Sequence, residues 1–263
     1  MEAIVTAGGI NLPNDPLYQL TGVVKKALIP LAGRPMINWV VEALYGSGLV
    51  KHIVIVGLEP DEITFNAIPI HFVASVGGLL DNVLIGVNKV RTLNPSIDKI
   101  LLSSSDIPLI TPEIVRGFIS ECALQDGDVY YAIVEEKTME ARFPGSKRTF
   151  VPFKGGRYSG GDIFLFKNTA VDKTNVDLLR SLTGSRKNYL AQARMLGFSF
   201  IIRFLLRLMT VDEATARARE LLNVDARVVD TRFAELGMDL DKPHQYEMIK
   251  ADLEKREAQI LGG

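Results

Sequence analysis

The chain has 263 residues and only one cysteine, Cys122. A single thiol cannot form an internal disulfide, so nothing in the sequence points to an oxidising compartment. Cys122 shares one face of a predicted helix over residues 111–124 with Ile114 and Phe118, and free cysteines on such faces usually pack in the core. We therefore expect Cys122 to be buried and to have no catalytic role.

Long apolar segments are also absent. The most apolar stretch, residues 196–209, is too short to span a bilayer and contains Arg203 and Arg207. The opening MEAIVTAGG lacks the basic and apolar regions of a signal peptide. These absences lead us to expect a cytoplasmic protein without a transmembrane segment.

Neither sign of charge dominates, because 30 Lys and Arg side chains are balanced by 31 Asp and Glu. The net charge therefore gives no general attraction to nucleic acid, although a local basic site stays open. Hydrophobic residues make up 47% of the chain and charged residues 23%, which is typical of a globular protein rather than a disordered one. The length suits one large α/β domain or two small ones.

Several familiar site signatures are missing too. The chain contains no G-x-x-x-x-G-K-[ST] loop, no G-x-G-x-x-G after a strand and no G-x-S-x-G elbow. Its three histidines, His52, His71 and His244, are far apart in the sequence and form no metal-ligand spacing. Two of them lie at the starts of predicted strands, and we expect these two to be structural. These absences disfavour a P-loop, a Rossmann dinucleotide site and a serine hydrolase.

What the sequence does contain is a regular alternation of short apolar runs with amphipathic segments. We predict strands over residues 3–7, 52–58, 70–75, 99–106, 128–135 and 162–166. Several are apolar nearly throughout, as in strands that helices cover on both faces. One predicted helix starts at Pro35 and stops before Gly48, and the helix over 111–124 is capped by Thr111. The alternation predicts a three-layer α/β/α sandwich.

Residues 171–222 break this alternation, because the pattern there is mainly helical and rich in arginine. We predict a single domain over 1–263, with 171–222 as a helical insertion or lid within it. Residues 185–209 have the pattern of an amphipathic helix pair, which is expected to pack on its own domain. A homo-oligomer or a peripheral membrane contact through 196–209 is the alternative.

The first stretch that suggests chemistry is the Gly-Gly turn in TAGG, residues 6–9, at the end of the first predicted strand. In open α/β sheets ligands bind beyond the carboxyl ends of strands, and glycine lets backbone N–H groups turn toward an anion. Lys25 and Lys26 follow shortly after, and an ammonium group reaching that turn would compensate phosphate charge. A tight turn and a solvated lysine pair are the plain alternatives.

Acidic residues stand at two further turns. Asp106 ends a predicted apolar strand in SSSDIPLIT, at the same sheet edge as the Gly-Gly turn. Asp239 and Asp241, two residues apart in MDLDKP, point the same way if the chain is extended there. Magnesium prefers one or two carboxylates together with phosphate oxygens, so these residues are candidate ligands. Ordinary helix capping is the alternative, although Thr111 already offers the cap after Asp106.

A basic cluster lies in GSKRTFVPFKGGR, residues 145–157, and includes Arg148. Such clusters are common on solvated hairpins. The Gly160–Gly161–Asp162 strand that follows slightly favours a second reading, a site for the phosphate of an acceptor.

Taken together, these motifs resemble the MobA-like NTP transferase group of nucleotidyltransferases. TAGG with KALIPLAGRPMI is similar to the opening of that family, SSSDIPLIT to its strand-end motif, and MDLDKPHQYE to its last motif. VGGLLDNVLIGV (76–87) is similar to the base-pocket segment, and YSGGDIFLF (158–166) to the strand facing the acceptor. The resemblance implies a Rossmann-like, GT-A-type fold with a mostly parallel mixed sheet.

The resemblance also implies roles for individual residues. The predicted nucleotide-binding residues are Ala7, Gly8, Gly9, Lys25, Gly78 and Asn82. The predicted catalytic residues are Lys26 and Asp106, and Mg²⁺ would be held by Asp106, Asp241 and Asp239. The predicted acceptor-binding residues are Arg148, Gly161 and Asp162. The implied reaction transfers NMP from an NTP, with CTP or GTP favoured, to a small phosphorylated acceptor and releases pyrophosphate.

Two departures from the family pattern are visible. The family has an arginine soon after its Gly-Gly turn, whereas residues 9–25 of this chain form a longer loop without arginine, so Lys25 is a candidate replacement. Lys242 and Gln245 also replace common family residues. A GT-A glycosyltransferase that uses Asp239 and Asp241, and a non-catalytic nucleotide-binding module, are the rival functions. Pyrophosphate release from NTP and acceptor separates them.

Overall fold

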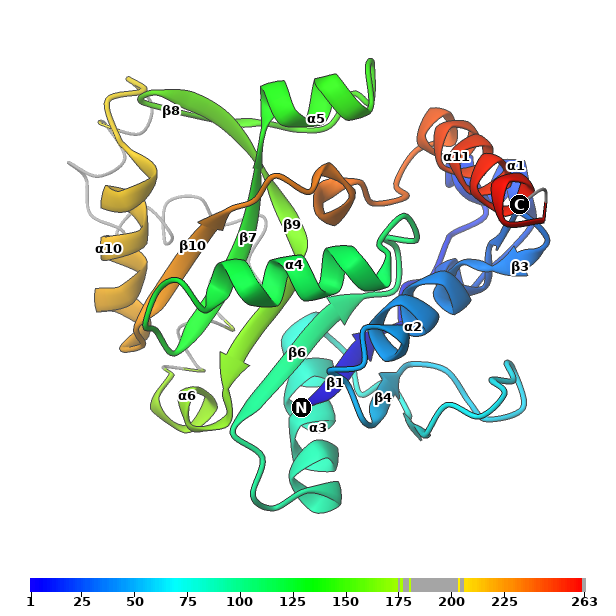
Figure 1. Ribbon diagram of the computed structural model, residues 1–263, viewed down its shortest axis with the longest axis horizontal. Helices are drawn as coiled ribbons and strands as arrows, with labels where there is room; N and C mark the ends of the chain where they lie inside the picture. The colour runs from blue at the N-terminus through cyan, green and yellow to red at the C-terminus, as the bar shows by residue number, and fades with distance from the viewer. Residues whose placement is uncertain (175, 177–179, 181–202, 204–205, 262–263) are drawn as a thin grey trace.

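The computed structural model describes residues 1–174, 176, 180, 203 and 206–261. Within this part, eight strands form one sheet (Figure 1). Seven of them follow the order β10 (Ala226–Asp230), β7 (Val129–Glu135), β9 (Gly156–Lys167), β6 (Lys99–Ser104), β1 (Glu2–Thr6), β4 (Ile53–Val56) and β5 (Ile70–Val73). The eighth, β8 (Val151–Phe153), pairs with β9. Strand β9 runs antiparallel to its neighbours, and the other pairs are parallel, so the sheet is mixed and mostly parallel.

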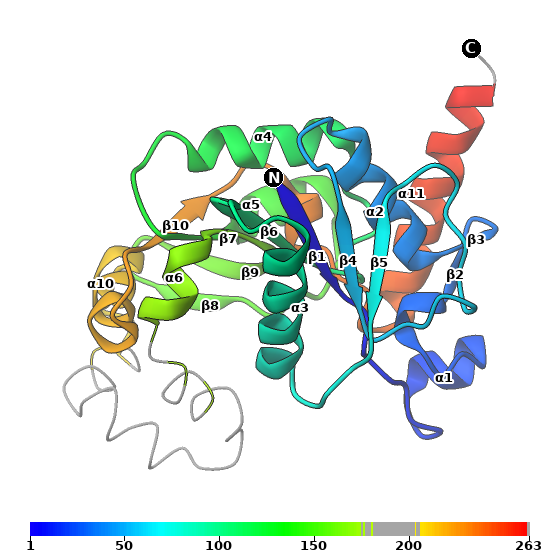
Figure 2. The ribbon, with the colours of Figure 1, turned by 90° about the horizontal axis from the view of Figure 1, so that it is seen from below.

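Helices cover both faces of this sheet (Figure 2). Helices α2 (Met36–Gly46) and α4 (Pro112–Cys122) lie on one face, and α3 (Leu79–Leu93), α6 (Asn168–Lys173) and α10 (Val211–Leu222) lie on the other. Helix α5 (Glu136–Arg142) follows β7, whereas α1 (Pro16–Thr21), the β2–β3 hairpin (Pro30–Leu31, Arg34–Pro35) and α11 (Pro243–Leu261) gather at one end. The predicted three-layer α/β/α arrangement is confirmed.

The core between the sheet and the α2/α4 layer follows from the apolar spacing of these helices. Val40 and Leu44 of α2 and Phe118 of α4 are fully buried in it. Cys122 is 1% exposed in the same cluster, which confirms the predicted burial. Burial raises the pKa of its thiol to about 12, so the thiol stays protonated and unreactive near neutral pH.

The helix ends agree with the sequence signals. The Oγ1 of Thr111 accepts a hydrogen bond from the N–H of Ile114, and Pro112 opens α4 as predicted. Helix α2 begins one residue later than predicted, at Met36, because Pro35 is extended and caps the helix. It ends at Gly46, and Gly48 follows with a φ of +73°.

The predicted insertion over 171–222 is described only in part. The last three residues of α6 and the whole of α10 fall within it and are helical. Most of the predicted helix pair over 185–209, including most of 196–209, lies outside the described residues. Strand β10 follows α10 after three residues and was not predicted. In the part of the chain that the structure describes, no helix is both long and apolar enough to cross a membrane.

Candidate active site

The candidate site lies where the carboxyl ends of β1 and β6 meet, because these strands are parallel neighbours. The Nζ of Lys26 lies 2.7 Å from Oδ2 of Asp106 and 2.5 Å from Oδ1 of Asp241. Lys26 belongs to the short helix η1 (Lys26–Leu28), Asp106 follows β6, and Asp241 precedes α11. Three predicted residues from distant parts of the chain thus form one ion-pair cluster.

Charge and burial reinforce each other in this cluster. The side chains of Lys26 and Asp106 are each 17% exposed, and that of Asp241 is 53% exposed. Burial alone would lower the pKa of Lys26, but the charges of Asp106 and Asp241 outweigh it and raise that pKa. For Asp241 burial opposes ionisation, and the Lys26 ammonium reverses this and lowers the pKa. The ammonium and the Asp241 carboxylate therefore stay charged near neutral pH.

The Gly-Gly turn lies directly against Lys26. The N–H of Lys26 donates to the carbonyl of Gly9 at 3.0 Å, which joins the turn to the lysine. Gly57 has a φ of +111°, and a Cβ there would come within 2.5 Å of the Cα of Gly8. The N–H of Ala7, which was predicted to contact the nucleotide, instead donates to the carbonyl of Val56 at 2.8 Å.

The long loop between Gly9 and Lys26 folds back on itself. Ile10 and Lys25 pair as an antiparallel bridge, and the N–H of Asn11 donates to the carbonyl of Val24 at 2.7 Å. The Nζ of Lys25 lies 2.5 Å from Glu62. Lys25 is therefore held by its own carboxylate partner, away from the Lys26 cluster, and the two adjacent lysines have different surroundings.

The predicted base-pocket residues lie at the start of α3. Gly78 is the residue before the first turn, and Asn82 is only 5% exposed. The Oδ1 of Asn82 accepts from the N–H of Val76 at 2.9 Å, and its Nδ2 donates to the Oγ of Ser75 at 3.0 Å. In this structure the Asn82 amide thus fastens the loop before α3, which positions Gly78.

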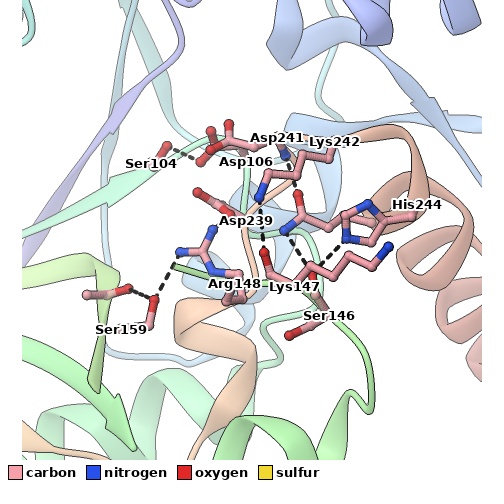
Figure 3. Close-up of polar contacts among 12 residues, drawn as sticks. Ser104, Asp106, Ser146, Lys147, Arg148, Ser159, Asp239, Asp241, Lys242 and His244 are labelled. Atoms are coloured by element: carbon pink, nitrogen blue, oxygen red, sulfur yellow. Dashed lines mark hydrogen bonds and ion pairs between the residues drawn. The ribbon is translucent and has the colours of Figure 1, made fainter. Parts of the chain in front are cut away.

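A second ion pair lies beside the first (Figure 3). Arg148 and Asp239 face each other, and their side chains are 11% and 12% exposed. The Nη2 of Arg148 also reaches the Oγ of Ser159 at 3.4 Å. Asp239 and Asp241 therefore have different partners, Arg148 for the first and Lys26 for the second, although they are only two residues apart.

The segment that carries these aspartates is fastened to the loop before β8. The Nε2 of His244 lies 2.8 Å from the carbonyl of Ser146, and the Nζ of Lys242 donates to the carbonyl of Lys147 at 3.0 Å (Figure 3). The side-chain Oε1 of Gln245 accepts from the N–H of Asp241 at 2.9 Å. Sequence reasoning missed the roles of His244 and Lys242, because contacts between positions about 100 apart leave no local pattern.

Asp162 is the other notable carboxylate of the site. Burial, followed by the nearby charge of Asp106, raises the pKa of Asp162 to about 7. Its Oδ2 is enclosed and has no hydrogen-bond partner among the described residues. Gly161 precedes it in β9 and is buried. Asp162, a predicted acceptor-binding residue, thus also lies close enough to Asp106 for the charge of that carboxylate to act on it.

No set of three or more His, Cys, Asp or Glu side chains is grouped for metal binding in the described part of the chain. Asp106 and Asp241 nevertheless direct one oxygen each at a single cation, the ammonium of Lys26. The hydroxyl of Ser104 donates to the other oxygen of Asp106 and fixes its orientation. The arrangement can therefore hold one positive centre between two carboxylates.

Comparison with known proteins identifies relatives of this chain. The sequence pattern of the MobA-like NTP transferase domain matches residues 19–188. The structure is similar to that of a hypothetical transferase from Thermus thermophilus, with 33% identity, a TM-score of 0.79, and coverage of 94% of this chain and 100% of the other. It also resembles 4-diphosphocytidyl-2C-methyl-D-erythritol synthase from Anaerococcus prevotii, with 12% identity, a TM-score of 0.58, and coverage of 96% and 97%. These likenesses confirm the predicted Rossmann-like, GT-A-type fold.

Among curated proteins, the bifunctional protein GlmU of Geobacter metallireducens is 33% identical over 101 residues. The match covers 36% of this chain and 20% of that protein. The chain thus aligns with only about a fifth of this relative's length, so the likeness does not extend to GlmU as a whole.

Proposed function

Because the chain belongs to the MobA-like NTP transferase family, we propose that it transfers a nucleoside monophosphate from a nucleoside triphosphate to a small phosphorylated acceptor. The family predicted from the sequence motifs is the one that matches. An oxygen of the acceptor phosphate attacks the α-phosphorus, the bond from that phosphorus to the bridging oxygen breaks, and pyrophosphate leaves with the bonding electrons. The attacking oxygen is already anionic, so this reaction needs no strong general base.

The observation that carries the proposal is the position of the Lys26 ammonium beside Gly9 and between two carboxylates, 2.7 Å from Asp106 and 2.5 Å from Asp241. Phosphoryl transfer depends mainly on alignment and on neutralising phosphate charge. A triphosphate held by the Gly8–Gly9 turn would bring its charge next to this ammonium. Lys26 would then bind the phosphates and stabilise the transition state.

The same carboxylates fit a magnesium ion. Asp106 and Asp241 already converge on one cation, and Mg²⁺ is bound in proteins by one or two carboxylates with phosphate oxygens and water. Bound there, the ion would neutralise phosphate charge at the reacting centre. Ser104 fixes the Asp106 carboxylate, and Gln245 fixes the backbone of Asp241, so both ligands would be held in place.

We assign the acceptor to the neighbouring side of the site, formed by Arg148, Gly161 and Asp162. A guanidinium group can bind a phosphate through two parallel hydrogen bonds. Arg148 is held by Asp239 and lies near Ser159, which keeps it oriented while most of its surface is covered. An acceptor phosphate would share Arg148 with Asp239.

The proposal is tested first by nucleotide binding. A panel of four NTPs with Mg²⁺ is added to the protein, and the shift in melting temperature is measured. A ligand that binds only the folded state stabilises it, so the NTP that binds should raise the melting temperature. We expect CTP or GTP to give the largest shift. Pyrophosphate release is then measured with NTP and a set of phosphorylated acceptors. Binding without pyrophosphate would favour a non-catalytic module, and release of a nucleoside diphosphate from a sugar nucleotide would favour a glycosyltransferase.

The roles of individual residues are tested with variants. Lys26→Ala and Asp106→Asn should each reduce kcat by roughly 10²–10³-fold, the range seen when one preorganised electrostatic contact is removed. Lys51→Ala, an exposed lysine outside the site, serves as the matched control. Wild-type turnover in Lys26→Ala would refute its assigned role.

A further inference from the structure

The sheet beside the reaction centre is apolar on both faces, and the described residues bury one face more completely than the other. In β6 and β9, Leu101 and Ile163 point to the α2/α4 layer and are fully buried. Their neighbours Leu102 and Phe164 point to the opposite face and are only partly buried by the rest of the protein. Helices α3 and α6 flank this part of the sheet on either side (Figure 2). An apolar surface therefore lies next to the site.

This surface forms the floor of a cavity of about 380 Å³. Leu102 and Phe164 belong to the floor, Val83 of α3 to one wall and Val171 of α6 to another. Ligand sites in proteins are typically cavities of this size that are lined mainly by apolar side chains, with a few polar groups placed to orient the ligand.

Two of the polar residues of this cavity belong to the reaction centre. Ser104 and Asp162 both line it. The hydroxyl of Ser104 donates to Asp106, and the enclosed Oδ2 of Asp162 has no hydrogen-bond partner among the described residues. The cavity is therefore continuous with the candidate active site: its polar end lies at the carboxylates, and its apolar body extends away from them.

We propose that this cavity binds the body of the acceptor, and that the acceptor is a phosphate ester of an apolar group, such as an alkyl or cyclic hydrocarbon, rather than a free sugar phosphate. This inference rests on the proposed nucleotidyl transfer. The phosphate would lie near Arg148 and Asp106, and the hydrocarbon would cover Leu102 and Phe164. A sugar in the same place would leave its hydroxyl groups unpaired against aliphatic side chains, which is unfavourable.

The inference is tested with a series of alkyl phosphates from ethyl to octyl phosphate. Their affinities for the wild-type protein are measured by calorimetry in the presence of Mg²⁺, with glucose 1-phosphate as the polar comparison. Each methylene buried in the cavity should tighten binding by about fourfold until the cavity is full. Equal affinity along the series, or tighter binding of glucose 1-phosphate than of octyl phosphate, would overturn the inference.

Two variants fill the cavity from opposite walls, Val83→Phe from α3 and Val171→Trp from α6. Each should abolish most of the increase in affinity with alkyl chain length, so that octyl phosphate binds about as weakly as butyl phosphate. Leu124→Trp, at a side chain that is 83% exposed and does not line the cavity, should retain the full gain. A full gain in both filled variants would place the alkyl chain elsewhere and refute the cavity as its site.

Failure of this inference can be told apart from failure of the proposed function. The thermal shift with NTP and Mg²⁺ reports the nucleotide site alone. A normal NTP shift without alkyl dependence rejects only the apolar acceptor, whereas alkyl dependence without any NTP shift rejects the nucleotidyl transfer on which the substrate assignment rests.

Discussion

At the scale of single residues, Lys25 and Lys26 have the same side chain but different surroundings. Lys26 is held by Asp106 and Asp241, whereas Lys25 is held by Glu62. The difference was predictable from the sequence only through the resemblance, which aligns Lys26 with the family lysine. Charge alone could not separate the two, because a lysine in a structural ion pair and a lysine in a site look the same in a sequence.

Asp162 makes the stability of the protein depend on pH. Its pKa is raised from an ordinary value of 3.8 to about 7 in the folded state, so folding favours the protonated acid. The free energy of unfolding should therefore fall as the pH rises from about 4 to about 7, by at most about 4 kcal/mol from this group. Asp162→Asn should remove that fall, so the variant is more stable than the wild type at pH 8 and close to it at pH 4.

Urea unfolding at both pH values measures this effect. Asp61→Asn, at an exposed carboxylate, is the control and should change stability little at either pH. The same gain for Asp162→Asn at pH 4 as at pH 8 would contradict the prediction.

At the scale of elements, the Gly57 turn after β4 supports the Gly-Gly turn after β1. A Cβ at Gly57 would come within 2.5 Å of the backbone of Gly8. Gly57→Ala should therefore push Gly8 out of place and weaken NTP binding by roughly tenfold, a loss of about 1.4 kcal/mol. Isothermal calorimetry with NTP and Mg²⁺ measures it.

Gly48→Ala separates this effect from backbone strain. Gly48 also has a positive φ, +73°, but no atom lies within 4 Å of the position of its Cβ. The control should lose some stability and retain NTP affinity. A similar affinity in both variants would rule out a positioning role for Gly57.

Strongly apolar elements were predictable, and elements defined by long-range pairing were not. The runs that became β1, β4, β6 and β7 read as strands because they are rich in apolar residues. Strands β1 and β4 are buried on both faces of the sheet, whereas β6 and β7 are only partly buried on one face. Strand β10 escaped prediction because ARVVD is short, begins with Ala and Arg, and follows a helix after only three residues. It forms a strand because it pairs with β7, and no local sequence pattern indicates this pairing.

The candidate site was likewise predictable only where it depends on local features of the sequence. The strand-end position of Asp106 and the Gly-Gly turn are local features, so the sequence places both at one sheet edge. The pairing of Arg148 with Asp239 joins residues on two separate loops, and nothing near either residue indicates it. The proximity of Asp162 to the charge of Asp106 likewise depends on β9 lying beside β6.

At the scale of the whole molecule, a second apolar core joins the two ends of the chain. It contains Leu17 and Leu31 from the N-terminal segments and Leu240, Ile249 and Leu253 from the C-terminal one, all nearly or fully buried. Lys26 and Asp241 lie next to this core in sequence. The core therefore brings the two halves of the ion-pair cluster together.

Ile249→Ala tests this link. The side chain is 0% exposed, so its truncation should lower the free energy of unfolding by about 2–5 kcal/mol. Because α11 follows Asp241 directly, NTP affinity should fall as well. Leu124→Ala, at a side chain that is 83% exposed, is the matched control and should change neither quantity. A large loss of stability with unchanged NTP affinity would show that the core does not align the site.

The same core has a consequence for synthesis on the ribosome. Its members span Leu17 to Leu253 and include Leu109, Val134 and Phe143 between them, so the cluster is complete only after Leu253 has been translated. Until then Leu31 and Met36 have no C-terminal partners to cover them, and exposed apolar surface promotes aggregation of nascent chains. Lys26 likewise gains its second carboxylate partner only after Asp241 has been translated.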